Sequence, residues 1–218
     1  MAVRDVKMTA EEFRLLESDK RCELINGEIV YMSPSCGLPS AYPLIMGTEP
    51  QTDSLYKSIS DLPAGVPRPG FLHQKISGEI FFSIKSYISK HKGKCQVYAA
   101  PADVKLSDDT VVQPDIFVSC DPSRIDGQYH NGAPDWVIEI LSPSTAGIDL
   151  GKKLFLYRSA GVREYWAIDP DEKKIIVYLF ENSHSNIEFY SFKDSISAGI
   201  YRNNDEPLVI RAADFFDE

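Results

Sequence analysis

The chain has 218 residues, of which 43% are hydrophobic and 25% are charged, and its formal net charge is −9. This composition is ordinary for a globular protein, and the length predicts one domain over residues 1–218. We find no apolar run as long as a membrane span, and no signal-peptide core in residues 1–20. We therefore expect a cytoplasmic protein without membrane attachment.

The acidic charge disfavours a broad nucleic-acid surface, because proteins gain much of their affinity for DNA by neutralising its phosphates. The lysines of residues 85–94 are a candidate for a local basic patch, for which a solvated helix face is the simpler explanation. These lysines are Lys85, Lys90, Lys92 and Lys94.

The cysteines are widely spaced and include no Cys-x-x-Cys pair. This spacing argues against a zinc site and against a disulfide framework. Reduced thiols are expected in a cytoplasmic protein. The four residues are Cys22, Cys36, Cys95 and Cys120.

The N-terminal region predicts a short helix followed by a hairpin. Thr9 and Glu12 have the spacing of a capping box, which marks the start of a helix. In residues 22–32, the Asn-Gly pair at 26–27 suits a tight turn between two apolar runs. Residues 34–71 are rich in Pro, Gly and Ser, and predict a long loop or insertion with a helical turn at 54–59.

The rest of the chain alternates between helical and strand patterns. The spacing of apolar residues predicts helices over 73–91, ended by Gly93, and over 150–160, ended by Gly161. This order predicts an α/β or α+β fold in which helices cover a sheet. Strands are predicted over 95–106, 111–119, 135–141, 164–168, 174–180 and 187–192.

Two carboxylates lie in apolar strand-like runs, where a charge is costly unless a metal, a hydrogen bond or an opposite charge compensates it. Asp115 follows a proline, and a solvated or capping aspartate at a strand bend would explain it alone. Glu139 lies in Trp-Val-Ile-Glu-Ile-Leu, and a buried salt bridge is the competing explanation. Together with a lysine, the two acids are the parts of a metal-dependent phosphodiesterase site.

Helix geometry selects the lysine. In the helix over 150–160, Lys153 lies within the apolar stripe, whereas Lys152 points to the opposite side. A lysine directed at the sheet can neutralise carboxylates or phosphate charge. The competing explanation is that Lys153 extends its charged end to water at the edge of the stripe.

Several segments, in this order, resemble a bacterial restriction-endonuclease-like family, a domain of unknown function within the PD-(D/E)xK nuclease superfamily. The resemblance spans most of residues 10–180. The segments are Glu-Leu-Ile-Asn-Gly-Glu at 23–28, His73, Pro114-Asp115, residues 137–145, Asp149 with Lys153 and Tyr157, and residues 161–170.

The resemblance implies a restriction-endonuclease-like fold, with a central mixed β-sheet flanked by helices and an N-terminal helix and hairpin. It also implies that Asp115 and Glu139 bind a divalent cation, Mg²⁺ or Mn²⁺. The carbonyl of Ile140 is the expected third oxygen ligand. Lys153 would orient water or stabilise phosphate charge. The superfamily's usual lysine position holds Leu141, and members of this family place the lysine on the following helix instead. Residues 37–70 are longer than the family's usual link.

Three further residues are secondary candidates. Glu23 could approach the site from the N-terminal hairpin and Glu79 from the long helix, each as an outer ligand, although a surface position explains Glu79 better. His73 matches the family pattern at a helix start, where a role in the site and a role in capping or packing stay open.

The leading hypothesis is a Mg²⁺-dependent endonuclease that uses Asp115, Glu139 and Lys153 to hydrolyse nucleic acid, with DNA as the expected substrate. The alternative is a catalytically inactive nuclease fold that acts as a binding or assembly module, favoured by Leu141 and the acidic charge. A glycoside hydrolase ranks third, because two carboxylates can also cleave a sugar bond. A homodimer is expected if both strands of DNA are cut.

Overall fold

The structure is a computed structural model that describes residues 7–16, 22–31, 70–142, 145–180 and 186–215. Helix α1 (Ala10–Arg14) has the predicted capping box, in which Thr9 and Glu12 bond each other's backbone amides. Strands β1 (Cys22–Ile25) and β2 (Glu28–Tyr31) form the predicted hairpin, and Asn26 and Gly27 adopt positive φ angles of 53° and 79° at its turn. The expected loop at 34–71 lies outside the described residues except at 70–71, and so does the helical turn at 54–59.

Helix α2 (Phe71–Lys90) begins two residues earlier than predicted and buries one isoleucine per turn. A β-branched residue every fourth position makes a narrow apolar stripe along the helix. The Gly93 amide bonds the carbonyl of Ile88 just beyond the helix end, where the glycine stop was expected. The buried isoleucines are Ile76, Ile80, Ile84 and Ile88.

Two of the predicted strands are each divided into two, and this corrects the sequence-based boundaries. The strand expected over 95–106 is β3 (Gln96–Ala99) and β4 (Val104–Ser107), and the strand expected over 111–119 is β5 (Thr110–Val112) and β6 (Ile116–Ser119). A proline lies in each gap, at 101 and 114. Proline has no amide hydrogen to donate to a ladder, so the chain leaves one sheet at these points and enters another.

The larger sheet has six strands in the order β11-β10-β9-β8-β6-β3. Its remaining strands are β8 (Trp136–Ile140), β9 (Glu164–Asp169), β10 (Lys174–Leu179) and β11 (Asn186–Ser191). Strands β8 and β9 are parallel and the other pairs are antiparallel, so the sheet is mixed, as the resemblance implied.

The parallel pair is joined by a helical crossover that starts before the predicted residue 150. It consists of α3 (Ala146–Ile148), a π-helical segment (Asp149–Lys153) and α4 (Leu154–Ala160). Gly161 ends α4 with a φ angle of 95°, a left-handed conformation in which glycine carries no steric penalty.

The second sheet has five strands in the order β2-β1-β5-β4-β7, where β7 is His130–Asn131. A third pair, β12 (Ser195–Ser197) and β13 (Val209–Arg211), lies in the C-terminal region, where only the strand now seen as β11 was predicted. Short 3₁₀ turns complete the chain at Pro122–Arg124, Gly199–Tyr201 and Ala212–Phe215.

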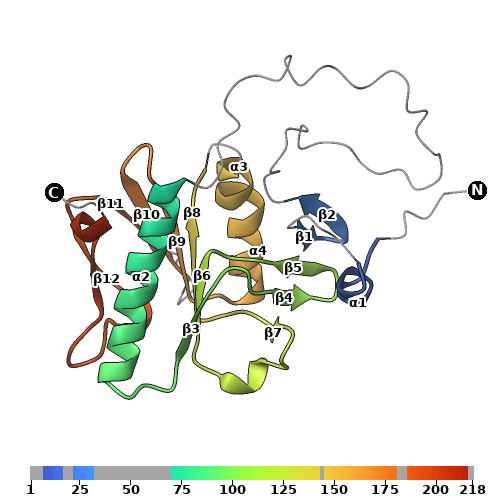
Figure 1. Cartoon of the computed structure of the whole chain (residues 1–218), viewed down its shortest axis with the longest axis horizontal. Coiled ribbons are helices and arrows are strands. Elements are labelled where there is room, and N and C mark those ends of the chain that lie inside the picture. Colours follow the sequence, from blue (N-terminus) through green and yellow to red (C-terminus); the bar gives the residue numbers. More distant parts are fainter. Residues whose placement is uncertain (1–6, 17–21, 32–69, 143–144, 181–185, 216–218) are drawn as a thin grey trace, which may run out of the picture.

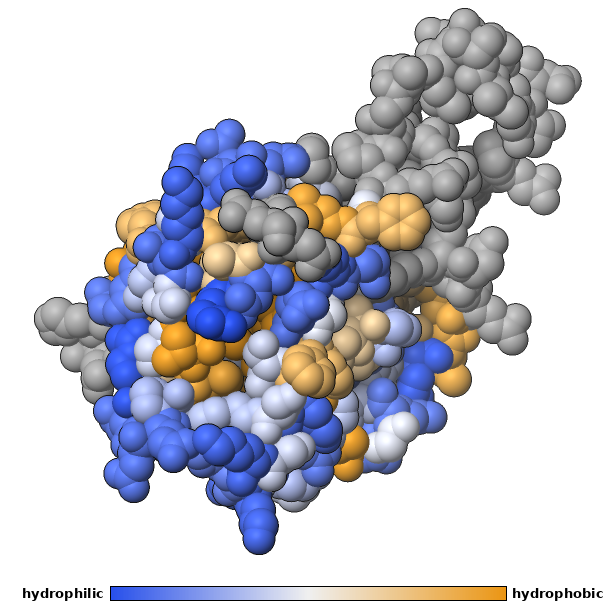
Figure 2. All heavy atoms as spheres, turned by 60° about the vertical axis from the view of Figure 1, so that its left-hand side comes forward, coloured by the Kyte–Doolittle hydropathy of each residue, from blue (hydrophilic) through white to orange (hydrophobic). Residues whose placement is uncertain are grey.

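The six-stranded sheet is covered on both faces (Figure 1). Alternate residues of β8 belong to different cores, because side chains alternate across a strand: Ile138 packs with α2, and Val137 packs with α4 and the five-stranded sheet. Glu139 therefore points to the side of α4. The surface of the molecule in the view of Figure 2 is mostly hydrophilic, and apolar residues form separate patches on it. Within the described ranges, no helix has both the length and the apolarity to cross a bilayer.

The expectation that all cysteines are reduced is wrong for one pair, because Cys95 and Cys120 form a disulfide. The two residues are 25 positions apart in sequence, and the pairing of β3 with β6 brings them together. Cys22 is buried in the N-terminal core, and Cys36 lies outside the described residues.

Candidate active site

The two predicted carboxylates lie side by side where the chain passes from one sheet to the other. Asp115 immediately precedes β6, Glu139 is on β8, and these strands pair with Ile116 opposite Ile138. The Ile140 amide donates a hydrogen bond of 2.9 Å to Asp115 Oδ2. Asp115 is thereby anchored to the residue that follows Glu139.

Lys153 lies at the centre of the cluster, with only 1% of its surface exposed. Its Nζ is 3.0 Å from Glu139 Oε1, 2.9 Å from Glu23 Oε1 and 3.4 Å from Asp149 Oδ1. Lys152 is exposed, so the side chain that helix phase selected is the one that points inward. Lys153 does not extend to water, and a salt bridge to Glu139 is present.

Asp149 and Tyr157 complete the cluster, although the sequence assigned them no role beyond matching the family. They lie one turn before and one turn after Lys153, and the wide π-helical turn leads directly into α4. The Tyr157 hydroxyl donates a 2.7 Å hydrogen bond to Glu139 Oε1, and the Tyr165 hydroxyl bonds the Asp149 carbonyl at 3.1 Å. The spacing of four residues between polar side chains on an apolar helix stripe was the available signal.

Glu23 comes from β1 in the other sheet and is fully buried. Its neighbour Leu24 faces the N-terminal core, so alternation along the strand turns Glu23 toward Lys153. The Gln113 amide donates a 2.7 Å hydrogen bond to Glu23 Oε1, whereas Oε2 is buried without a hydrogen-bond partner among the described residues. Glu23 is therefore part of the cluster, and its contacts to Gln113 and Lys153 are made through Oε1.

The remaining two candidates have different positions. His73, near the start of α2, places Nε2 3.3 Å from Asp115 Oδ2, which links this helix to the cluster. Glu79 is half-buried further along α2, and the contacts that hold the cluster together do not include it.

The cluster contains more negative than positive groups. Burial raises the pKa of Glu139 to about 8, and the charges of Asp149, Asp115 and Glu23 act in the same direction, against the opposing effect of Lys153. Burial also raises the pKa of Asp149. Burial alone would lower the pKa of Lys153, but the surrounding carboxylates reverse this effect and keep the lysine charged.

Asp115 behaves differently from the other acids. Burial would raise its pKa, but the hydrogen bond and charge of His73, the Ile140 amide and Lys153 together lower it. Asp115 is thus held in its ionised form, whereas the ionised form of Glu139 needs additional positive charge nearby.

These residues fit a hard divalent cation. The cluster has an excess of carboxylate oxygens, and Glu23 Oε2 has no hydrogen-bond partner within the described part of the chain; such oxygens are the donors that Mg²⁺ and Mn²⁺ prefer. Among the described residues, no group of three or more His, Cys, Asp or Glu side chains is arranged to hold a metal ion. Mg²⁺ is commonly bound through only one or two carboxylates with several waters, so a larger cluster is not a condition for binding it.

The mixed sheet, its helical cover and the acidic cluster define a restriction-endonuclease-like α/β protein, and a solved structure has the same fold. It is a crystal structure from Anabaena variabilis ATCC 29413, described as a "putative nuclease belonging to DUF820", with a TM-score of 0.67 and 22% sequence identity. The match covers 96% of this chain and 97% of that one.

The Uma2 family, described as "Putative restriction endonuclease", matches residues 62–200, which is more than half of the chain. The chain belongs to this family. Membership supports a nuclease function, and with it a nucleic-acid substrate. No curated protein matches the chain.

Proposed function

We propose that this protein is a Mg²⁺- or Mn²⁺-dependent endonuclease that hydrolyses phosphodiester bonds, with DNA as its substrate. One observation carries the proposal: Asp115, Glu139 and Lys153, from three separate elements, are linked within one buried cluster where the two sheets meet. The family match supports phosphodiester chemistry over hydrolysis of a sugar bond.

Asp115, Glu139 and the Ile140 carbonyl would hold the cation. When bound, it would supply Lewis-acid activation of the scissile phosphate and of water. Lys153 contributes a fixed positive charge that orients water or offsets the negative charge of the phosphate. Glu23 and Asp149 hold the lysine amine in place, and the Tyr157 hydroxyl fixes the Glu139 carboxylate through Oε1.

The test is nicking of supercoiled plasmid DNA by the full-length protein with Mg²⁺ or Mn²⁺. Asp115→Asn and Glu139→Gln keep side-chain shape but remove the charge, and each should reduce the cleavage rate by roughly 100-fold or more. Asp171→Asn and Glu172→Gln are the matched controls, because they make the same changes in the exposed turn between β9 and β10. Metal-dependent cleavage that survives the Asp115→Ala/Glu139→Ala double variant would overturn the proposal.

A catalytically inactive binding module is the second candidate, and a specific observation favours it. Lys153 contacts three buried carboxylates, which is also how a purely structural salt bridge would be built. Calorimetric titration separates the two: the endonuclease binds Mn²⁺ in the millimolar range or tighter, and Glu139→Gln weakens the binding. A flat titration of the intact protein favours the inactive module.

A further inference from the structure

A second feature lies at the opposite end of β6 from the acidic cluster. Asp115 immediately precedes this strand and Cys120 immediately follows it, so the two residues are roughly 17 Å apart along an extended strand. Cys120 and its disulfide partner Cys95 both line a cavity of about 570 Å³. The residues of the acidic cluster do not line this cavity.

The disulfide lies at the wall of the cavity, and the two cysteines stay together when it opens. Both are only half-buried. The pairing of β3 with β6 runs from Ala99 opposite Ile116 to Gln96 opposite Ser119, and Cys95 and Cys120 are the next residues in the same register. Strand pairing therefore keeps the two sulfurs close in the reduced protein, and thiol exchange requires only access to one of them.

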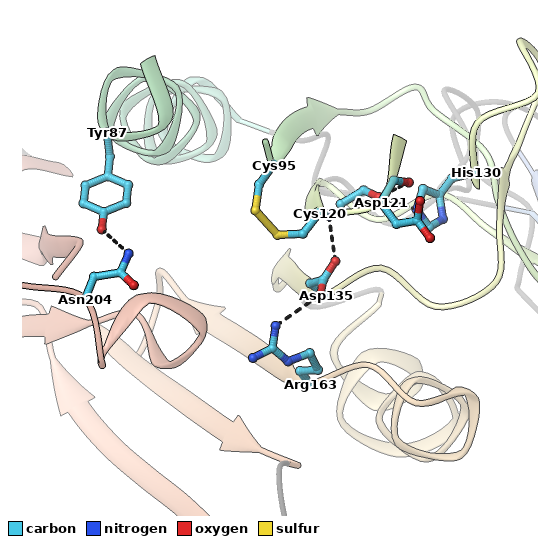
Figure 3. Close-up of a disulfide and its surroundings, with 9 residues drawn as sticks. Tyr87, Cys95, Cys120, Asp121, His130, Asp135, Arg163 and Asn204 are labelled. Carbon is cyan, nitrogen blue, oxygen red and sulfur yellow. Dashed lines mark hydrogen bonds and ion pairs between the residues drawn. A yellow bond between two sulfur atoms is a disulfide. The ribbon is translucent and has the colours of Figure 1, made fainter. Parts of the chain in front are cut away.

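The cavity wall is cationic. Lys94, Arg124 and Arg163 line it together with Asp121 and Asp135, which leaves one positive charge in excess. Figure 3 shows Asp135 between the disulfide and Arg163. Asp135 accepts hydrogen bonds from the Cys120 amide at 2.7 Å and from Arg163 Nη1 at 3.2 Å, so one carboxylate is engaged with the backbone next to the sulfur. Asp121 Oδ2 is 3.6 Å from Arg124 Nε.

Tyr201 contributes an aromatic side chain to the cavity wall. The side chain is 8% exposed and lines the cavity, and its buried hydroxyl has no hydrogen-bond partner in the part of the chain that the structure describes. A buried polar group without a partner is costly, so this end of the cavity wall is not optimised for stability alone. Lys94, by contrast, is exposed beside Cys95, where it can attract an anion before binding.

We propose that the cavity binds small anionic thiols and that the Cys95–Cys120 disulfide exchanges with them. A thiolate attacks one sulfur of the protein disulfide, the sulfur–sulfur bond breaks, and the other cysteine leaves as a thiolate beside a mixed disulfide. A second thiolate attacks the mixed disulfide, releasing the small disulfide and leaving both cysteines reduced. Two small thiols thus supply the two electrons that the protein disulfide accepts.

The test compares three small thiols of different charge on the oxidised full-length protein: mercaptopropionate, mercaptoethanol and cysteamine. Opening of the disulfide is followed by alkylation and mass spectrometry of the fragments that contain Cys95 and Cys120, so Cys22 and Cys36 do not contribute. At equal thiolate concentration, and with each rate divided by that of the same thiol on a small uncharged disulfide to remove differences in thiolate nucleophilicity, we expect the anionic thiol to react roughly tenfold faster than the cationic one. Circular dichroism should show that the reduced protein stays folded.

Lys94→Glu should abolish or reverse this charge preference. Lys85→Glu makes the same charge change on the exposed side of α2, away from the cavity, and should leave the preference intact. An equal effect of the two variants would overturn the assignment of the cavity as the thiol site. A disulfide that opens only when the protein is unfolded would overturn the proposal altogether.

Discussion

Lys153 is the residue on which the acidic cluster is centred. A lysine with 1% of its surface exposed is rare, and here three carboxylates from β1, β8 and the π-helical segment surround its amine. Separating such charges from water is costly, and their mutual attraction offsets that cost only while all partners are in place. The cluster therefore depends on the lysine amine for its stability.

Lys153→Met tests this balance. The methionine fills a similar volume but leaves Glu23, Glu139 and Asp149 buried without the opposite charge, so we expect the free energy of unfolding at neutral pH to fall by about 3–5 kcal/mol. Urea denaturation measures the change, and exposed Lys152→Met, the neighbouring control, should stay within about 0.5 kcal/mol of the wild type. A Lys153→Met protein as stable as the control would show that the amine does not hold the cluster together.

At the scale of elements, Glu164 ties the end of one strand to the C-terminal region. It is fully buried on β9, and its carboxylate accepts hydrogen bonds from the Trp166 indole and from the Gly199 and Ile200 amides at 2.7–2.9 Å. Glu164→Gln places an NH₂ group against a donor, and we expect a loss of about 1–3 kcal/mol in the free energy of unfolding. Glu172→Gln in the exposed turn is the control for denaturation experiments.

Glu164 also makes stability depend on pH. Burial raises its pKa in the folded protein, and the hydrogen bonds offset this only in part. The folded state therefore holds the proton more tightly than the unfolded state, and stability falls as the pH rises from 4.5 through the raised pKa. The difference in unfolding free energy between wild type and Glu164→Gln should shrink over this range. A difference that grows with pH would contradict the raised pKa.

The disulfide also links two elements, β3 and β6, and its contribution to the free energy of unfolding can be measured. It joins residues 25 positions apart, and a loop of that size constrains the unfolded chain by about 3–4 kcal/mol. The Cys95→Ser/Cys120→Ser variant should lose this amount in urea denaturation and remain folded, because strand pairing of β3 with β6 persists. An unfolded double variant would mean that the bond is required for the fold.

At the scale of the whole molecule, the excess negative charge of the cluster predicts stabilisation by divalent cations. A ligand that binds only the folded state at about ten times its dissociation constant adds about 1.4 kcal/mol, which raises the melting temperature by a few degrees. Mn²⁺ should produce this shift in the wild type, EDTA should remove it, and Asp115→Asn should not show it. An equal shift in that variant would place the cation elsewhere.

The sequence predicts that residues 1–218 form one domain. It also predicts a homodimer if both strands of DNA are cut. Light scattering coupled to size-exclusion chromatography tests the second prediction. A monomer that nicks single strands agrees with the proposed chemistry, whereas a dimer brings two acidic clusters into one assembly.

Local patterns in the sequence predicted most of the helices and strands, and they also predicted that the Lys153 side chain points inward. The capping box at Thr9, the Asn-Gly turn, the isoleucine stripe of α2 and the phase that turns Lys153 inward depend on neighbours within a few residues, so they can be read from one segment. Asp115 and Glu139 stood out because a charge in an apolar run is costly wherever the strand lies.

Only the tertiary structure decided which of these groups meet. The split of 111–119 into β5 and β6 sends the chain from one sheet to the other at Pro114, and this crossing brings Glu23 within 2.9 Å of Lys153. The Cys95–Cys120 bond depends on strand pairing across 25 residues of sequence. Propensity and periodicity describe single segments, whereas contacts between distant segments arise from packing the two sheets and the crossover helix into one core.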